Sequence, residues 1–157
     1  MPITLAAHAG FCVGVRKAME KAFSAAEEAG RNNIPCYALG DLIHNDQAVE
    51  KLRSAGVVRV DRVEDVPRGS VIILRSHGVG PDIMEACEKQ GLRTVDCTCA
   101  YVQALHNVVQ ETRLDGTPVI LVGDGEHPEV TATAGWCKSK CIIIENEAQA
   151  ESMQPLE

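Results

Sequence analysis

Short apolar runs alternate with segments of helical periodicity along almost the whole chain. Val71 to Leu74 is a continuous apolar run, typical of a central parallel strand, and 118–122 is a second such run. Between these runs apolar residues recur at helical spacing, as over 13–29, where Gly30 follows as a natural helix end. Strands that alternate with helices predict parallel sheets with helices on both faces. We therefore expect an α/β protein of repeated small parallel-sheet domains.

The alternation of apolar runs and segments of helical spacing also predicts the order of the strands and helices. We expect strands over 3–7, 34–39, 57–60, 71–74, 92–95, 118–122 and 141–144. We expect helices over 13–29, 45–55, 81–90 and 100–113, a helical turn over 62–66 and a short helix after Pro128. Aromatic residues make up only 3% of the chain, so the core must come from Val, Ile, Leu and Ala. Such a core suits parallel strands covered by helices.

The pattern restarts near Cys97 to Cys99, which predicts a domain boundary there. We assign residues 1–98 to a first α/β domain. Within it, residues 1–8 are a candidate for a strand that joins another domain of a longer protein. Residues 99–157 then form an incomplete second α/β domain. A chain of 157 residues is long enough for one complete domain and part of another.

Charge and cysteine content narrow the classes of partner. A net charge of −7 with scattered lysines and arginines argues against nucleic acid, because phosphate neutralisation requires a basic face. No apolar run approaches membrane-spanning length, and the first residues lack the basic and apolar regions of a signal peptide. Seven cysteines without a secretory signal favour metal binding, redox chemistry or buried thiols over a disulfide framework. We expect a cytoplasmic protein that binds neither nucleic acid nor membranes.

Cys12 and Cys99 each follow a predicted strand and begin a predicted helix. Free backbone N–H groups and the positive end of a helix dipole at such a turn favour the thiolate, which binds metals and acts as a nucleophile. Gly10 and Gly14 flank Cys12 and allow backbone or a bulky cofactor to approach the sulfur. One interpretation is a pair of iron–sulfur ligands, and the other is two buried thiols. Cys97 is an alternative ligand to Cys99.

The remaining cysteines are expected to be structural. Cys36 lies in a predicted strand, and Cys87 lies on the apolar face of a predicted helix. Cys137 and Cys141 are separated by three residues, unlike the pairs of a zinc knuckle, and no histidine pair stands near them.

Three histidines, His44, His77 and His127, lie in loops that follow predicted strands. Ligands of open α/β sheets bind at the carboxyl ends of the strands, so these histidines are expected to face a binding crevice. Imidazoles there can hydrogen-bond a phosphate and carry part of its charge, although a loop histidine is more commonly just solvated. Glu129 begins a helix two residues after His127, where it either complements the helix dipole or transfers protons.

Taken together, these motifs resemble the LytB/IspH family over essentially the whole chain. The matching segments, in the family's order and spacing, are 10–15, 44–45, 76–79, 96–99 and 127–130. Members of this family are the 4-hydroxy-3-methylbut-2-enyl diphosphate reductases of the non-mevalonate isoprenoid pathway. The resemblance implies reductive dehydroxylation of that diphosphate to isopentenyl and dimethylallyl diphosphates.

The resemblance also implies roles for individual residues. Cys12 and Cys99 would be two of three cysteine ligands of a [4Fe–4S] cluster, whose fourth iron would bind the substrate hydroxyl. The electrons would come from a donor such as ferredoxin or flavodoxin. The diphosphate would be bound by three imidazoles, and the proton relay would use a carboxylate and one of those imidazoles. In this chain the residues concerned are His44, His77 and His127 for the diphosphate, and Glu129 with His127 for catalysis.

Two residues depart from the family pattern: Ala100 replaces the usual proline, and Cys97 stands where alanine is common. Family members are nearly twice as long, and their third ligand cysteine lies in the remaining part. We therefore expect this chain to fold at least in part but to lack reductase activity alone. Two other classes stay open: a metal- or phosphate-binding α/β module without catalysis, and a thiol-redox regulator that uses Cys97 and Cys99.

Overall fold

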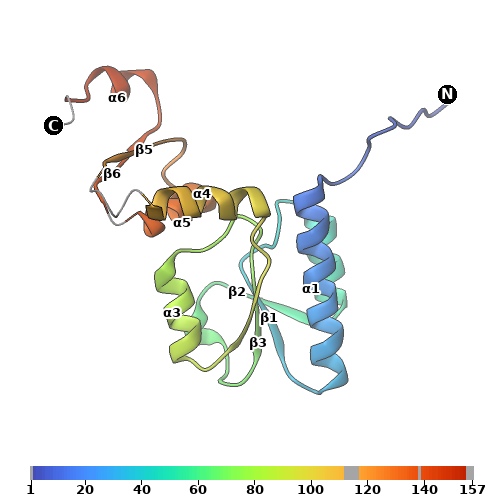
Figure 1. Ribbon diagram of the computed structural model, residues 1–157. Coiled ribbons are helices and arrows are strands. Elements are labelled where there is room, and N and C mark those ends of the chain that lie inside the picture. The colour runs from blue at the N-terminus through green and yellow to red at the C-terminus, as the bar shows by residue number, and fades with distance from the viewer. Residues whose placement is uncertain (1, 112–116, 138, 155–157) are drawn as a thin grey trace.

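The computed structural model describes residues 2–111, 117–137 and 139–154, which contain two parallel sheets (Figure 1). The larger sheet has four strands in the order β2-β1-β3-β4, and the smaller one pairs β5 with β6. The strands are β1 (Cys36–Leu39), β2 (Val57–Val60), β3 (Val71–Leu74), β4 (Arg93–Asp96), β5 (Val119–Val122) and β6 (Cys141–Ile144). The predicted α/β class with parallel sheets is confirmed.

The helices alternate with these strands as the periodicity predicts. They are α1 (Val13–Arg31), α2 (Asp46–Ser54), α3 (Pro81–Lys89), α4 (Ala100–Glu111), α5 (Pro128–Trp136) and α6 (Glu147–Glu151), with a 3-10 turn η1 (Val63–Asp65). Asn45, where a helix was expected to begin, is the N-cap of α2, because its side chain accepts the N–H of Ala48 at 2.9 Å. Pro81 is the first residue of α3, as predicted. Arg113, the predicted end of the fourth helix, lies outside the described residues.

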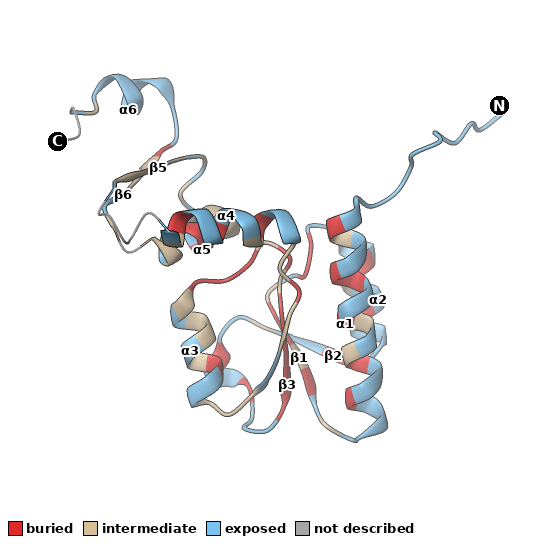
Figure 2. Cartoon of the chain, viewed as in Figure 1, coloured by how far each residue is buried: buried red, intermediate tan, exposed pale blue. Residues whose placement is uncertain are grey.

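Helices cover both faces of the four-stranded sheet (Figure 2). Successive residues of a strand point to opposite faces, so Ile73 packs under α1 and α2 while Ile72 packs under α3 and η1. Both side chains are at most 1% exposed. On the first face, α1 presents a stripe of small residues that includes Ala22 and Ala26, which lets this helix lie close to the sheet. The prediction of helices on both faces is confirmed.

The order of the strands places a binding crevice between β1 and β3. The chain leaves β1 toward α2 on one face and leaves β3 toward α3 on the other. Neighbouring parallel strands whose connections run in opposite directions open a crevice at their carboxyl ends. The loops that follow β1, β3 and β4 therefore meet at one edge of the sheet. His44, His77 and Cys99 lie in these loops.

Two expectations about elements are wrong. Residues 3–7 form no strand, and Ile3 and Leu5 are 91% and 82% exposed, because the described residues offer no neighbouring strand to pair with them. This segment leads away from the rest of the chain (Figure 1). β5 is not a buried strand, since its residues alternate between half-buried and exposed. The sequence analysis did not predict α6, which Asn146 caps by accepting the N–H of Gln149 at 3.0 Å.

Candidate active site

Cys12 and Cys99 lie at the starts of α1 and α4, and their sulfurs converge beside Gly14. Cys12 is the N-cap of α1, and its Sγ accepts the N–H of Val15 at 3.5 Å. A β-carbon on Gly14 would lie 2.4 Å from Cys99 Sγ and 4.0 Å from Cys12 Sγ. Both sulfurs therefore lie within 4.0 Å of one point on α1. Only a residue without a side chain leaves room for this arrangement.

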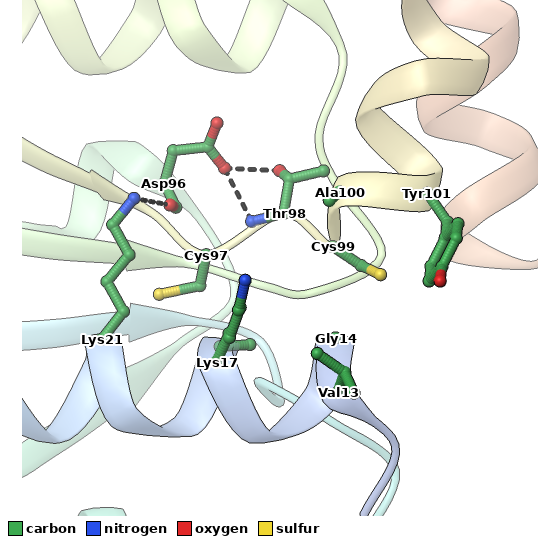
Figure 3. Close-up of a pocket in the computed structure, with 11 residues that line it drawn as sticks. Val13, Gly14, Lys17, Lys21, Asp96, Cys97, Thr98, Cys99, Ala100 and Tyr101 are labelled. Atoms are coloured by element: carbon green, nitrogen blue, oxygen red, sulfur yellow. Dashed lines mark hydrogen bonds between the residues drawn. The ribbon is translucent and has the colours of Figure 1, made fainter.

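A cavity of about 270 Å³ separates the start of α1 from the turn after β4 (Figure 3). Cys97 and Cys99 both line this cavity, but their side chains point in opposite directions (Figure 3). Cys97 is 3% exposed, and burial raises the pKa of its thiol to about 12. Cys97 is thus a protonated core thiol at neutral pH, whereas Cys99 faces the same space as Cys12.

Hydrogen bonds fix the turn that carries Cys99. The Asp96 carboxylate accepts the N–H of Thr98 at 2.9 Å and also the Thr98 hydroxyl, while Lys21 Nζ donates to the carbonyl of Asp96 (Figure 3). The N–H of Cys99 donates to the carbonyl of Ser76 at 2.9 Å. This last bond ties the thiol turn to the residue that precedes His77. The candidate metal ligand and the histidine loop are therefore held by adjacent strand ends.

The structure brings the three predicted histidines together. The ring centroids of His44 and His77 lie 4.5 Å apart. Those of His127 lie 5.8 Å from His44 and 5.7 Å from His77. The three rings come from the loops after β1, β3 and β5, so the cluster joins the larger sheet to the segment that follows α4. They form one imidazole cluster at the carboxyl edge of the larger sheet.

Two of these rings have hydrogen-bonding atoms whose surroundings the structure defines. Burial first, and then charge repulsion from His44, His127 and Arg75, together lower the pKa of His77 to about 4. Nδ1 of His77 is buried and has no hydrogen-bond partner among the described residues. Nδ1 of His127 accepts the N–H of Glu129 at 3.2 Å, which leaves Nε2 as the donor of that ring.

Glu129 lies half-buried in the first turn of α5, where its backbone N–H orients His127. Its carboxylate interacts with His106, whose pKa it raises against the larger opposing effect of burial. His106 is 2% exposed and stacks on Trp136 with ring centroids 5.9 Å apart, so it is a packing residue. The structure thus places Glu129 beside the imidazole cluster through the backbone of α5.

The low pKa of His77 predicts a loss of stability in mild acid. An unfolded histidine binds its proton near pH 6.5, whereas folded His77 does so only near pH 4. The free energy of unfolding therefore has its full value with respect to His77 above pH 6.5. It decreases as the pH falls from 6.5 toward 4, because the unfolded chain binds a proton at His77 that the folded chain does not. We expect His77→Gln to remove about 1–2 kcal/mol of this acid destabilisation in denaturant unfolding at a series of pH values. His8→Gln, in the exposed N-terminal segment, should leave the pH profile unchanged, and equal profiles for both variants would contradict the prediction.

The other cysteines divide into core thiols and a neighbouring pair. Cys36 and Cys87 are buried as predicted, and burial raises the pKa of each thiol. Cys137 and Cys141 are close together between the end of α5 and the start of β6. Burial and the neighbouring Cys137 raise the pKa of Cys141 to about 11.

Sequence reasoning missed Arg75 and the residues that support Cys99. Arg75 lines a cavity of about 230 Å³ together with His44 and His77. Its sequence signal is its position directly after the buried run that ends at Leu74. The contact of Lys21 with the carbonyl of Asp96 joins segments 75 residues apart, so no local pattern reveals it.

The residues present fit an iron–sulfur cluster in part. Two thiols at helix N-termini are suitable soft donors, and the glycine beside them leaves open space. Among the described residues no group of three or more His, Cys, Asp or Glu side chains is placed to hold a metal ion. The two thiols would therefore need a further ligand from outside the described chain.

The fold and the site together define the class of this protein as α/β. At one edge of its larger sheet, the converging thiols of Cys12 and Cys99 lie next to the imidazole cluster. Residues 3–157 match the LytB protein family. The chain therefore belongs to the LytB family. In the described part of the chain, no helix is both long and apolar enough to cross a bilayer.

The relatives of this chain are reductases. It is 41% identical over 154 residues to the 4-hydroxy-3-methylbut-2-enyl diphosphate reductase of Clostridioides difficile, covering 98% of this chain and 54% of that protein. It is 40% identical over 146 residues to the enzyme of the same name from Aquifex aeolicus, covering 91% and 49%. The chain spans about half the length of the curated relatives it matches.

Two solved structures share the fold. One is (E)-4-hydroxy-3-methyl-but-2-enyl diphosphate reductase, the terminal enzyme of the non-mevalonate pathway, with a TM-score of 0.80 and 39% identity over 94% of this chain and 52% of that chain. The other is the E-1-hydroxy-2-methyl-but-2-enyl-4-diphosphate reductase from Plasmodium falciparum, with a TM-score of 0.84 and 29% identity over 96% and 46%.

Proposed function

We propose that this chain forms part of a 4-hydroxy-3-methylbut-2-enyl diphosphate reductase, which yields isopentenyl and dimethylallyl diphosphates. The observation that carries the proposal is the convergence of Cys12 and Cys99 beside Gly14, joined to the imidazole cluster by the hydrogen bond from Cys99 to Ser76. The similarity of the chain to named reductases supports the same conclusion. Because the chain spans about half of those relatives, the activity is proposed for a longer protein.

Cys12 and Cys99 would hold a [4Fe–4S] cluster together with a third ligand from outside the described residues. When bound, such a cluster supplies electrons and a Lewis-acidic iron. The chain's own contribution starts with the N-terminal turn of α1, whose N–H groups favour a negatively charged sulfur at its N-cap. The Cys97 thiol is unsuited to this role, because it is buried and points in the opposite direction to Cys99.

The imidazole cluster would bind the diphosphate group. Neutral His77 and Nε2 of His127 offer N–H donors, which can bind phosphate oxygens. His44, the exposed member of the cluster, contributes a third ring. Three donors from three loops hold the anion in a defined position, and positioning of this kind lowers the barrier to reaction.

Glu129 and His127 would handle the protons of the reaction. Reductive dehydroxylation consumes two electrons and two protons and releases one water. Nδ1 of His127 accepts the backbone N–H of Glu129, which leaves Nε2 as the N–H donor of the ring, and Glu129 lies in the first turn of α5. A carboxylic acid and an imidazole can each hold a proton and pass it to a leaving hydroxyl.

The domain bounds, the electron donor and the cellular compartment are also part of the proposal. We propose a first domain over 1–98, with residues 1–8 pairing as a strand in another domain, and an incomplete second domain over 99–157. An electron donor such as ferredoxin or flavodoxin would reduce the protein. The cytoplasm is the proposed compartment, because free thiols persist there.

Iron and sulfide uptake tests the assignment of the thiol pair. We expect the anaerobically reconstituted chain, supplied with 2-mercaptoethanol as an outside thiol ligand, to bind iron and acid-labile sulfide in equal amounts. Cys12→Ser and Cys99→Ser should each lower the uptake by about tenfold or more, because each removes a ligand. Cys97→Ser should retain the uptake, since that thiol is buried and points away.

Two outcomes would contradict the proposal. One equivalent of zinc without sulfide would indicate a metal-binding module instead of a reductase. Uptake that depends on Cys97 instead of Cys99 would reassign the ligand.

A further inference from the structure

Arg75 carries a positive charge and forms no ion pair with any described carboxylate. It lies one residue past the end of β3 and two residues before His77, and it is half-buried. Its Nε is buried and has no hydrogen-bond partner in the part of the chain that the structure describes. A cation withdrawn from water without a partner costs free energy, because it loses hydration and gains nothing in exchange. An anion bound beside Arg75 would offset this cost.

The guanidinium reaches over the end of β1 toward the loop of His44. A β-carbon on Gly40 would lie 3.5 Å from Nη1 of Arg75, so the two residues are in contact range. Arg75, His44 and His77 line one cavity of about 230 Å³, into which Pro128, the first residue of α5, also reaches. The unpaired charge thus borders the imidazole cluster.

The carboxylates of this cavity already have a partner. Asp41 and Asp61 both line the cavity, and each lies 2.9 Å from a guanidinium nitrogen of Arg59. Among the described residues, Arg75 has no ion pair with any carboxylate. One cavity therefore holds two arginines, of which Arg59 forms an ion pair with both carboxylates and Arg75 forms an ion pair with neither.

The histidines alone leave a diphosphate short of positive charge. His77 is neutral at pH 7, because burial and the neighbouring His44, His127 and Arg75 together lower its pKa to about 4. Nδ1 of His127 already accepts a backbone N–H, so that nitrogen is not free to bind a phosphate oxygen. A diphosphate carries more than one negative charge near neutral pH. A permanent cation is needed beside these rings, and a guanidinium keeps its charge at any pH that the fold tolerates.

We propose that Arg75 is a further binding residue of the diphosphate site and supplies its permanent positive charge through hydrogen bonds from the guanidinium to phosphate oxygens. The inference rests on the proposed function, since it adds a residue to the same site. The planar guanidinium presents several donors in one plane, which matches the geometry of phosphate oxygens.

The test is a calorimetric titration of inorganic diphosphate into the full 157-residue chain and three variants. Arg75→Gln should weaken binding by about 10- to 100-fold, the usual effect of losing hydrogen bonds to a charged group. Arg31→Gln should leave the affinity within about threefold of the parent chain, because Arg31 is exposed, pairs with Glu27 and does not line this cavity. Arg75→Lys keeps the charge without the planar donors and should bind with intermediate affinity.

The outcomes separate this inference from the proposed function. If the parent chain binds diphosphate, and does so less tightly after His77→Gln, while Arg75→Gln binds as tightly as the parent, the inference is wrong and the proposed function stands. If the parent chain binds no diphosphate, the proposed site fails and the role of Arg75 fails with it. Thermal unfolding of each variant, and the intermediate affinity expected for Arg75→Lys, distinguish lost binding from lost folding.

Discussion

Replacing Gly78 with alanine is expected to destabilise the protein by about 2–5 kcal/mol. Gly78 has a φ of +78°, and its β-carbon would lie 2.6 Å from Cε1 of His106 and 3.3 Å from Cγ2 of Thr98. His106 is 2% exposed and is stacked on Trp136, so its ring has little room to move. The left-handed backbone costs an alanine about 1–2 kcal/mol, and overpacking of a filled core adds about 1–3 kcal/mol.

Gly69→Ala is the matched control for this substitution. Gly69 has a φ of +81°, but nothing lies within 4 Å of its β-carbon position. We expect it to cost only the backbone strain of about 1–2 kcal/mol in denaturant unfolding. The difference between the two variants then measures the steric contact with His106 and Thr98. Equal losses for both variants would show that the packing at Gly78 is looser than the structure indicates.

The same substitution should also disturb the site. Gly78 follows His77 directly, and its neighbour Val79 accepts a hydrogen bond from Trp136 Nε1 at 2.8 Å. A methyl group at position 78 would push the loop away from α4 and from the turn that carries Cys99. We therefore expect Gly78→Ala, but not Gly69→Ala, to lose diphosphate binding as well as stability.

Local pattern was sufficient to predict most of the fold. The buried run that ends at Leu74 has one strong interpretation, because a central parallel strand is buried on both faces. Asn45 and Pro81 mark helix starts through chemistry that acts within four residues. The strand predicted over 3–7 failed for the opposite reason: a strand depends on a partner, and apolar composition alone does not provide one.

From the sequence, the candidate site could be predicted only for residues whose position is determined by the end of a strand. That His44 and His77 meet follows from the reversal of connections between β1 and β3. The choice between Cys97 and Cys99 was open in the sequence, because two thiols two residues apart share the same setting. The direction of each side chain distinguishes them, and that depends on packing against α1.

Arg75 was overlooked for a related reason. An arginine that follows an apolar strand is usually solvated, and nothing in its neighbours along the chain indicates otherwise. That Arg75 has no ion pair is apparent only in the folded chain, where both carboxylates of the cavity pair with Arg59, 16 positions away in the sequence. Charge balance of this kind is a property of the folded chain.

Replacing Gly14 with alanine is expected to lower iron and sulfide uptake by about tenfold or more while leaving the fold intact. The new methyl group would lie 2.4 Å from Cys99 Sγ and 3.6 Å from Cys99 Cβ. The sulfur can avoid this contact by rotating about the Cα–Cβ bond, so the cost in unfolding free energy stays near 1 kcal/mol or below. Rotation turns the sulfur away from Cys12, and the two thiols then no longer face a common point.

Gly30→Ala provides the control, because Gly30 belongs to the same helix and nothing lies within 4 Å of its β-carbon position. We expect this variant to gain up to about 1 kcal/mol from helix propensity and to take up iron and sulfide like the parent chain. Both variants should be compared by anaerobic reconstitution and by denaturant unfolding. If Gly14→Ala binds as much iron and sulfide as Gly30→Ala, Cys12 and Cys99 do not act as a pair, because a displaced sulfur on Cys99 would then be of no consequence for metal binding.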